Sequence, residues 1–292
     1  MRSYLISLLF LCLCGFSLHC QDRFPYPEVP NTLSSQEERI NYLVIHFWDR
    51  VDFNDEQILE TSKPILNYIY LLQNTDDELA DKGLRVLFEL AAPYEVFLNN
   101  LLDWFSKFLH DAHSPLYNDL FYAKVIKTAV DVNAPDSLKE ILAARLRIID
   151  QNQIGKTSNN IVLENKLGES FSLFDIKAQF ILVGFTNPVC SLCGKTEKMM
   201  LDSVPLNSLL EAGNLKVLVV CPEDNYDEWL MHEYPDKWIA GYDSTGSISS
   251  KRLYDIQYFP SFYLLDSEKV VLMKEAGWKD VENALSLILR FN

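Results

Sequence analysis

The sequence has few cysteines, no hydrophobic run of transmembrane length and too few basic residues to balance its acidic ones. Six cysteines in 292 residues are too few for a scaffold built on disulfides. Lys and Arg total 26 against 41 Asp and Glu, so the formal net charge is -15 and the chain repels phosphate backbones. We therefore expect no nucleic-acid partner. The chain also lacks a phosphate-binding loop, a dinucleotide-binding glycine pattern, a serine-nucleophile motif and a glycosidase signature.

The rest of the composition is that of a globular protein. Hydrophobic residues make up 48% of the chain and charged residues 23%, which excludes a wholly disordered chain, a collagen and a multi-span membrane protein. The length predicts about two domains, since a domain usually holds on the order of 100–200 residues.

The first residues have the layout of a secretory signal peptide. Arg2 precedes an apolar run over residues 4–18, and polar residues begin at Gln21. The run is shorter than the roughly 20 apolar residues of a transmembrane helix, and the abrupt change at Gln21 argues against a buried first helix. We predict a signal peptide over residues 1–20 and export to the periplasm or cell envelope. Cys20 would carry the lipid, and so the membrane attachment, of a bacterial lipoprotein. Simple export is favoured because His19 stands where that lipidation signal needs a small residue.

Residues 34–150 have the periodicity of helices. Apolar residues spaced three and four apart mark one helix face: Ile40, Leu43, Val44, Phe47 and Trp48. Ser34 with Glu37, or Ser35 with Glu38, has the spacing of a capping box at the start of this helix. We predict a domain of five or six helices over residues 34–150, with its many aromatic residues in the core. A groove for a peptide or glycan is the alternative.

Two histidines in this region, His110 and His113, lie three residues apart, a spacing that places both on one side of a helix. No paired carboxylate or cysteine pattern accompanies them. We therefore interpret them as surface histidines and predict no metal site.

The pattern changes after residues 152–160 (NQIGKTSNN), whose polar composition is typical of a linker. Short apolar runs then alternate with helical stretches. Residues 180–185 and 216–221 are predicted to be strands buried on both faces, and residues 262–265 and 270–275 to form a hairpin. Strands alternating with helices and followed by a hairpin predict a mixed α/β sheet with helices on both faces.

The motif that carries chemistry follows the first of these strands. Cys190 and Cys193 form a C-x-x-C, whose thiols can close a small disulfide ring at a helix start. Helix N–H groups and the helix dipole stabilise a thiolate there and lower the pKa of the first cysteine. A structural disulfide is the plain alternative in an exported protein. A zinc site is a weaker alternative. The motif supplies two zinc ligands, and the C-terminal part of the chain offers only Cys221 and His232 as further ligands.

The second half of the chain resembles a thioredoxin-like domain. The resemblance rests on FILVGFTNPVCSLC, KVLVVC, FPSFYLLDSEKVVL, AGW and a final helix, and it covers about residues 155–292. It is to exported bacterial thioredoxin-like proteins related to cytochrome-maturation thiol reductases and antioxidant thioredoxins. Residues 34–150 resemble a domain of unknown function found ahead of such domains. The implied fold class is α + α/β: an N-terminal all-helical domain followed by a thioredoxin-like α/β/α domain.

The resemblance also implies roles for three residues. Cys190 matches the nucleophilic cysteine, Cys193 the more buried resolving cysteine, and Pro260 a cis-proline that faces the thiols. The Cys190–Cys193 pair would then be a redox-active disulfide. A cis bond at Pro260 would aim the backbone of Phe259 at an extended substrate strand, whereas a trans proline that starts a strand is the alternative.

Some residues depart from the pattern of the family. Ser191-Leu192 replaces the frequent Gly-Pro between the cysteines, and Thr196 stands where several members have a glutamate, with Glu197 one residue later. These departures leave the cysteine pair intact.

We predict an exported thiol–disulfide oxidoreductase that acts on protein thiols or disulfides through Cys190 and Cys193, without a cofactor. A membrane-bound or soluble redox partner would recharge the pair, and the sequence does not set the direction of electron flow. The alternative is a non-catalytic interaction protein of the cell envelope that uses the thioredoxin fold as a scaffold. Cys221 is interpreted as a small buried hydrophobe. The acidic residues 223–228 are interpreted as a solvated helix start without a role.

Overall fold

The computed structural model describes residues 24–132 and 136–291. The chain divides into two compact units, 1–80 and 81–292, and each is described by itself. The predicted signal peptide and Cys20 lie outside the described residues. Within the described ranges, no helix has both the length and the apolar character needed to cross a membrane. The predicted division into domains at residues 34–150 and 155–292 stays a prediction.

The first unit is helical. It contains α1 (Gln36–His46), the 3-10 turn η3 (Glu56–Leu59), α2 (Lys63–Gln73) and the first turn of α3 (Asp77–Ala91). Ser35, not Ser34, caps α1: its hydroxyl accepts from the Glu38 N–H at 3.1 Å, and the Glu38 carboxylate accepts from the Ser35 N–H at 3.0 Å. The aromatic residues form a core, as predicted, in which Phe47, Trp48 and Tyr68 pack with ring centroids 5.0–5.3 Å apart.

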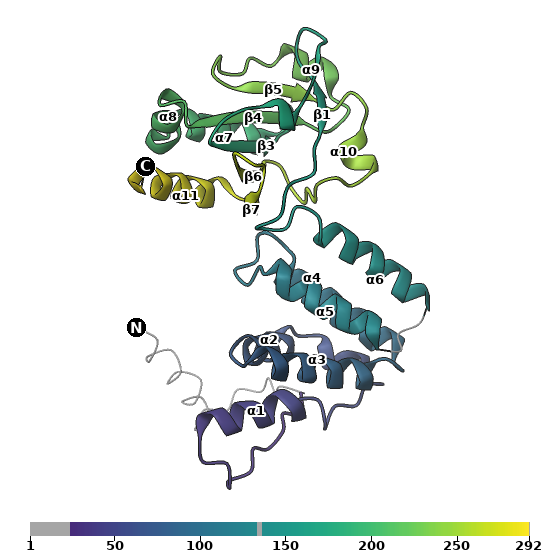
Figure 1. The fold of residues 1–292 in the computed structure, drawn as a ribbon. Coiled ribbons are helices and arrows are strands. Elements are labelled where there is room, and N and C mark those ends of the chain that lie inside the picture. The colour runs from purple at the N-terminus through teal and green to yellow at the C-terminus, as the bar shows by residue number, and fades with distance from the viewer. Residues whose placement is uncertain (1–23, 133–135, 292) are drawn as a thin grey trace. The chain divides into compact units, whose positions relative to one another are not determined.

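The second unit begins with further helices. After α3 come α4 (Glu95–Leu109), α5 (Asp119–Asp131) and α6 (Asp136–Ile149). Figure 1 shows α4 and α5 running alongside one another, and α6 packs against α5. The apolar faces that the sequence predicts are buried, with Phe105 of α4 and Tyr122 of α5 fully enclosed. Asn118 caps α5 by accepting from the Phe121 N–H at 3.0 Å.

A seven-stranded mixed sheet follows, in the order β2-β1-β5-β4-β3-β6-β7. Its strands are β1 (Val162–Glu164), β2 (Ser170–Ser172), β3 (Phe180–Phe185), β4 (Leu215–Cys221), β5 (Ile239–Tyr242), β6 (Ser261–Asp266) and β7 (Val271–Ala276). β3, β4 and β5 are parallel, while β6 and β7 are antiparallel to their neighbours. Its helices are α7 (Ser191–Leu201), α8 (Val204–Glu211), α9 (Tyr226–Met231), α10 (Ser247–Ser250) and α11 (Trp278–Phe291).

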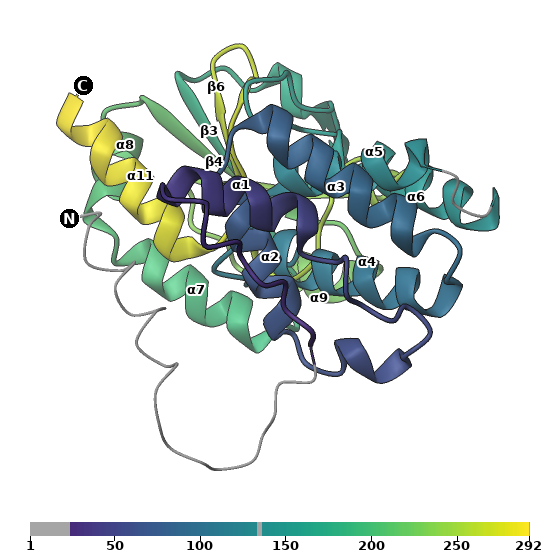
Figure 2. The same cartoon turned by 90° about the horizontal axis from the view of Figure 1, so that it is seen from below.

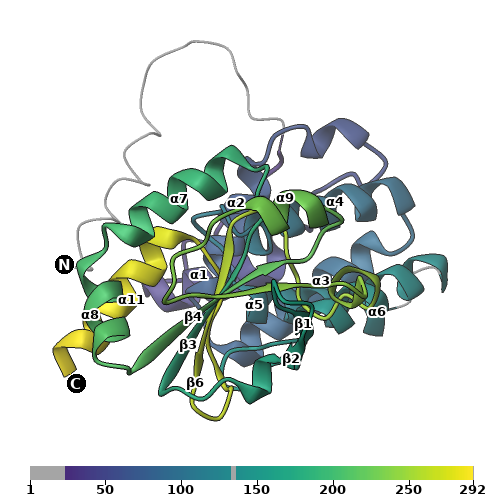
Figure 3. The same cartoon turned by 90° about the horizontal axis from the view of Figure 1, so that it is seen from above.

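The sheet buries side chains on both faces. In β3, Val183 and Phe185 point into one hydrophobic cluster, and Leu182 points into the other, as expected for a strand with alternating side chains. Met200 of α7 and Leu206 of α8 cover the second cluster together with α11. Figure 2 shows α8 and α11 side by side, and Figure 3 shows them with α7 along one face of the central strands.

The polar segment before the sheet is packed rather than extended in solvent. Asn152 and Ser158 are buried, although their composition predicts a linker. The Asn152 side-chain amide donates to the Leu253 carbonyl at 2.8 Å, and the Ser158 N–H donates to the Lys269 carbonyl at 2.8 Å. These polar side chains and backbone groups are buried because the turns before β6 and β7 satisfy their hydrogen bonds.

Candidate redox site

Cys190 lies where the chain leaves β3 and enters α7. A turn built on Asn187 connects the two, with the Val189 N–H donating to the Asn187 side chain at 3.0 Å and the Cys190 N–H to the Asn187 carbonyl at 3.0 Å. Cys190 is the N-cap residue of α7, and its Sγ accepts from the Cys193 N–H at 3.3 Å. The helix start therefore points N–H groups at the sulfur, as the sequence predicts.

The two thiols have different environments. Cys190 is half-buried, whereas Cys193, one turn into the helix, is only 6% exposed. Burial opposes ionisation of Cys190, but hydrogen bonds from the Cys193 thiol and from the Cys193 and Leu192 N–H groups outweigh it and lower the pKa of Cys190. Burial raises the pKa of Cys193 to about 12. A partly exposed thiol with a lowered pKa beside a buried thiol is the arrangement that a nucleophile and a resolving cysteine require.

The predicted cis peptide bond at Phe259–Pro260 is present. β6 starts at Ser261, directly opposite Phe185 at the end of β3, so Pro260 lies beside the strand that leads to the cysteines. The Cys190 thiol faces the Phe259 carbonyl with a sulfur–oxygen distance of 3.8 Å. Both cysteines are free thiols in this structure. Their pairing as a disulfide and the catalytic roles of Cys190, Cys193 and Pro260 stay predictions.

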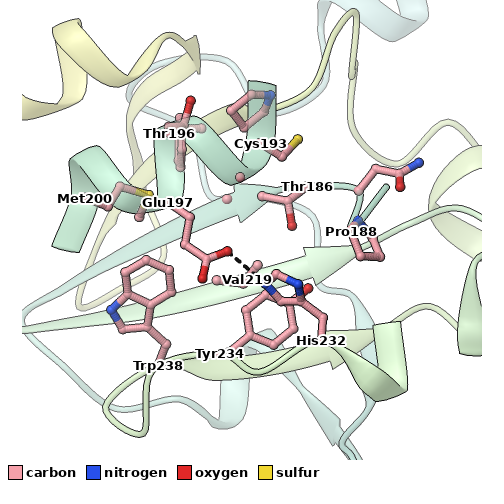
Figure 4. Close-up of a pocket in the computed structure, with 15 residues that line it drawn as sticks. Thr186, Pro188, Cys193, Thr196, Glu197, Met200, Val219, His232, Tyr234 and Trp238 are labelled. Carbon is pink, nitrogen blue, oxygen red and sulfur yellow. Dashed lines mark hydrogen bonds and ion pairs between the residues drawn. The ribbon is translucent and has the colours of Figure 1, made fainter. Parts of the chain in front are cut away.

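A small cavity adjoins Cys193. It has a volume of about 20 Å³, room for about one water molecule, and Cys193, Glu197, His232, Tyr234 and Pro260 are among its lining residues. Figure 4 shows Glu197 of α7 and His232, which follows α9, pointing toward each other; the Glu197 Oε2 and His232 Nε2 atoms are 2.9 Å apart. The pair is partly buried, with side chains 21% and 29% exposed.

This pair was not predicted. The sequence places Glu197 one position beyond the glutamate of related proteins, and it places His232 on a different element from the cysteines. The only available signal was the position of Glu197 one helical turn after Cys193, which puts both on the same side of α7. The contribution of His232 depends on how α9 packs, which spacing alone does not reveal.

Glu223 also contacts the site, although the acidic segment 223–228 was assigned no role. Its carboxylate accepts a hydrogen bond from the Asn187 side-chain amide, in the turn that positions Cys190. The negative charge of Glu223 raises the pKa of Cys190 and so opposes the hydrogen bonds that lower it. Cys221 is fully buried, and burial raises its pKa to about 11, which agrees with the prediction of a small hydrophobe.

One of the two paired histidines is not a surface residue. The His110 side chain is 21% exposed and lies between two carboxylates, with Nδ1 2.8 Å from Asp119 and Nε2 3.3 Å from Asp255. The prediction was wrong for His110 because Asp255 comes from a distant part of the chain. His113 is 66% exposed, as predicted. Among the described residues, no group of three or more His, Cys, Asp and Glu side chains is arranged to hold a metal ion.

The fold of the chain is thioredoxin-like, with helices ahead of the sheet. Three features define it: the parallel β3–β4 pair, a C-x-x-C at the start of the following helix, and a cis-proline loop that faces the first cysteine. The comparisons agree. Residues 12–152 match a family model described as a domain of unknown function, DUF5106. The crystal structure of a thioredoxin-like protein from Bacteroides caccae is 29% identical, with a TM-score of 0.76, and the match covers 91% of this chain and 98% of that one.

Two shorter structures each match just under half of the chain. The C-terminal domain of an uncharacterized protein from Bacteroides fragilis is 33% identical, with a TM-score of 0.45, over 46% of this chain and 98% of that one. The thioredoxin domain of a thiol-disulfide oxidoreductase from Bacteroides vulgatus is 24% identical, with a TM-score of 0.41, over 47% of this chain and 97% of that one. No curated protein matches.

Proposed function

We propose that the protein is an exported thiol–disulfide oxidoreductase that acts on protein disulfides or thiols. The observation that carries the proposal is the difference between the two thiols: Cys190 is accessible with a lowered pKa, and Cys193 is buried with a raised one. A structural disulfide needs no such difference, because neither sulfur has to ionise selectively.

The exchange would take place in two steps. The Cys190 thiolate attacks one sulfur of a partner disulfide, which forms a mixed disulfide and releases the other partner sulfur as a thiolate that takes up a proton. Cys193 then loses its proton and attacks the Cys190 sulfur, which closes the Cys190–Cys193 disulfide and releases the second partner sulfur as a thiol. The partner gains two electrons and the pair loses two. A dithiol donor restores the pair, and the reverse sequence oxidises partner thiols.

The second step needs a proton acceptor, because a thiol with a pKa of about 12 is protonated at neutral pH. The Glu197–His232 pair lines the same cavity as Cys193 and supplies a carboxylate and an imidazole. We assign it the role of accepting the Cys193 proton, through a water molecule in the cavity. Glu197→Gln should then leave the first step unchanged and lengthen the lifetime of the mixed disulfide roughly tenfold or more. Glu211→Gln, on the exposed surface of α8, is the control.

The main test is turnover. The purified protein, given dithiothreitol, should reduce insulin disulfides. Cys190→Ser and Cys193→Ser should abolish that activity, and Cys221→Ser should retain it. The same protein, oxidised, should be tested on a reduced, unfolded protein to detect the reverse direction. If neither direction shows turnover and the reduction potential of the pair is very negative, the chain is an interaction protein that uses the fold as a scaffold.

Export is tested separately by fractionating the host cell and measuring the mass of the mature N-terminus. A chain that begins at Gln21 in the envelope fraction supports simple export. A chain that begins at a lipid-modified Cys20 identifies a lipoprotein, and an uncleaved cytoplasmic chain contradicts export.

A further inference from the structure

A hydrogen-bond network joins the helical region to the segment that leads into Pro260. We call residues 110–118 the α4–α5 corner and residues 253–260 the proline loop. Gln257 of the proline loop uses both ends of its side chain. Its Nε2 donates to the His110 carbonyl at 2.8 Å and to the Glu275 Oε2 atom at 2.9 Å, and its Oε1 accepts from the Ala112 N–H at 3.3 Å.

Ionisable groups continue the network on either side. His110 lies between Asp119 of α5 and Asp255 of the proline loop. The second oxygen of Asp119 pairs with Lys274 of β7 at 2.8 Å, and Lys274 also donates to the Ile149 carbonyl at the end of α6, at 2.9 Å. The Asp119 and Lys274 side chains are only 7% and 3% exposed, so solvent screens this pair little.

Tyr258, which follows Gln257 in the proline loop, also has partners outside the loop. The Tyr258 hydroxyl donates to the Glu275 carbonyl at 3.0 Å, and its ring packs against His113 of the α4–α5 corner with centroids 4.2 Å apart. Residues 255, 257 and 258 therefore each have a partner outside the loop. Phe259 follows directly, with its carbonyl 3.8 Å from the Cys190 sulfur.

We propose that the α4–α5 corner is a positioning element of the redox site. It holds the proline loop so that the Phe259 backbone stays beside Cys190. An extended segment of a disulfide-bearing protein docks at this backbone. The inference rests on the proposed function. A loop fixed in advance does not lose conformational freedom when the substrate binds, so the network lowers the free energy needed to dock a strand. We expect the gain in binding free energy for protein substrates only, because a small disulfide reaches Cys190 without pairing with the proline loop.

Two variants test the proposal, one from each side. Gln257→Met keeps the length of the side chain and removes its three hydrogen bonds, and Gln257 is exposed, so the core is untouched. His113→Ala removes the ring that packs against Tyr258 and lies outside the thioredoxin-like region. Asn207→Ala is the control, since it also loses one side-chain hydrogen bond, to the Leu201 carbonyl at 2.7 Å, but away from the loop.

For Gln257→Met we expect KM for insulin to rise roughly three- to tenfold, the effect of losing about one net hydrogen bond. We expect the same direction for His113→Ala. The kcat for insulin, the rate with glutathione disulfide and the alkylation rate of Cys190 should stay within about twofold of the parent protein. An unchanged KM in both variants overturns the proposal. An equal loss with both substrates also overturns it, because that would be a general structural effect.

A second readout separates this inference from the proposed function. If the parent protein shows no turnover, the proposed function fails, and the network is then tested by hydrogen exchange. Gln257→Met should accelerate exchange of the backbone amides of residues 256–259 at least threefold and leave those of β3 and β4 unchanged. Unchanged exchange in the proline loop contradicts the positioning role whatever the outcome of the activity assay.

Discussion

We expect Cys190 and Cys193 to differ in reactivity because Cys190 is the N-cap of α7, whereas Cys193 is buried one turn into the helix. Hydrogen bonds at the start of α7 lower the pKa of Cys190, and burial raises that of Cys193 to about 12. We expect iodoacetamide to label Cys190 first, with a rate that rises with pH and levels off at a pH below the ordinary pKa of a thiol. Mass spectrometry of peptides labelled between pH 5 and 9 measures this. Cys221, whose pKa burial raises to about 11, serves as an internal control that stays unlabelled. Labelling of Cys193 before Cys190 would reverse the assigned roles.

Glu223 opposes the ionisation of Cys190. Its charge raises the pKa of Cys190, so Glu223→Gln should lower that pKa, and the effect should be small because Glu223 is exposed and screened by solvent. The alkylation profile of Cys190 should move to lower pH. Asp227→Asn, in the same acidic segment, removes the same charge and should leave the profile in place. Equal shifts in both variants would mean that only the net charge of the segment matters.

Part of this site could be predicted from the sequence and part could not. Cys190 and Cys193 follow from a motif directly after a strand, which is a local feature, and the cis bond before Pro260 follows from the resemblance to thioredoxin-like domains. Glu197 and His232 lie 35 residues apart and meet only because α9 packs near α7. The contact between His110 and Asp255 could not be predicted either, because the hydrophobic pattern of the sequence does not show that the loop with Asp255 packs against His110.

At the scale of elements, long apolar runs were predicted well and short strands were missed. The bounds of β3 are those of the predicted strand at residues 180–185, and β4 differs from its prediction by one residue, because both are buried on two faces. β1, β2 and β5 have three or four residues with mixed exposure, too short for periodicity to be seen. The helical segment before β6 is also short: the single turn of α10 spans Ser247–Ser250, and Arg252 has a left-handed backbone.

Glycine at position 241 fixes how closely β1 approaches β5. A Cβ atom there would lie 2.6 Å from the Leu163 side chain and 3.1 Å from that of Phe171. Gly241→Ala should therefore lower the free energy of unfolding by about 1–3 kcal/mol, the usual cost of overpacking. Gly194→Ala, in α7 with no atom within 4 Å of the added Cβ, should instead raise it by up to about 1 kcal/mol. Urea unfolding of both variants measures the difference, and a neutral Gly241→Ala would contradict the close approach.

The buried end of β7 makes stability depend on pH. Burial raises the pKa of Glu275 to about 9, so the folded protein keeps a proton that the unfolded chain releases near 4.5. The stabilisation is complete below about 4.5 and is lost as the pH rises toward 9, with a slope of at most about 1.4 kcal/mol per pH unit. Urea unfolding at pH 5, 7 and 9 should show this decline, and Glu275→Gln should flatten it. Glu268→Gln, in the exposed turn before β7, should not. A decline of equal slope in the Glu275→Gln variant would assign the effect to other groups.

The Lys274 Nζ atom lies 3.7 Å from Glu275 Oε1 but only 2.8 Å from Asp119 Oδ2, with which it forms an ion pair. The hydrogen bond from His110 and the Lys274 charge outweigh burial and lower the pKa of Asp119, so the ion pair is Asp119–Lys274 and Glu275 is the neutral acid beside it. This distribution places a compensated charge pair between α5 and β7.

At the scale of the whole molecule, the Asp119–Lys274 pair joins α5 to β7. Removing either partner leaves a buried charge without compensation, so Asp119→Asn and Lys274→Met should each cost about 3–5 kcal/mol of unfolding free energy. The double variant should cost less than the sum of the two. The exposed Glu211–Lys237 pair, with side chains 70% and 63% exposed, provides a matched cycle with a coupling energy near zero. Additive costs at Asp119 and Lys274 would contradict the buried pair.

The hydrogen bonds that support the proline loop also set the order in which the protein can assemble. The bonds from Gln257 to His110 and Ala112 span 147 and 145 residues, and that from Lys274 to Ile149 spans 125. A chain made from its N-terminus completes α4, α5 and α6 long before Gln257 and Lys274 exist, and contacts of such long range form slowly. We therefore expect the proline loop to take its place beside Cys190 only when synthesis of the chain is nearly complete. Until then, the helices made first leave His110 and Asp119 exposed to water, and the later loop and strand add Asp255 and Lys274 to them.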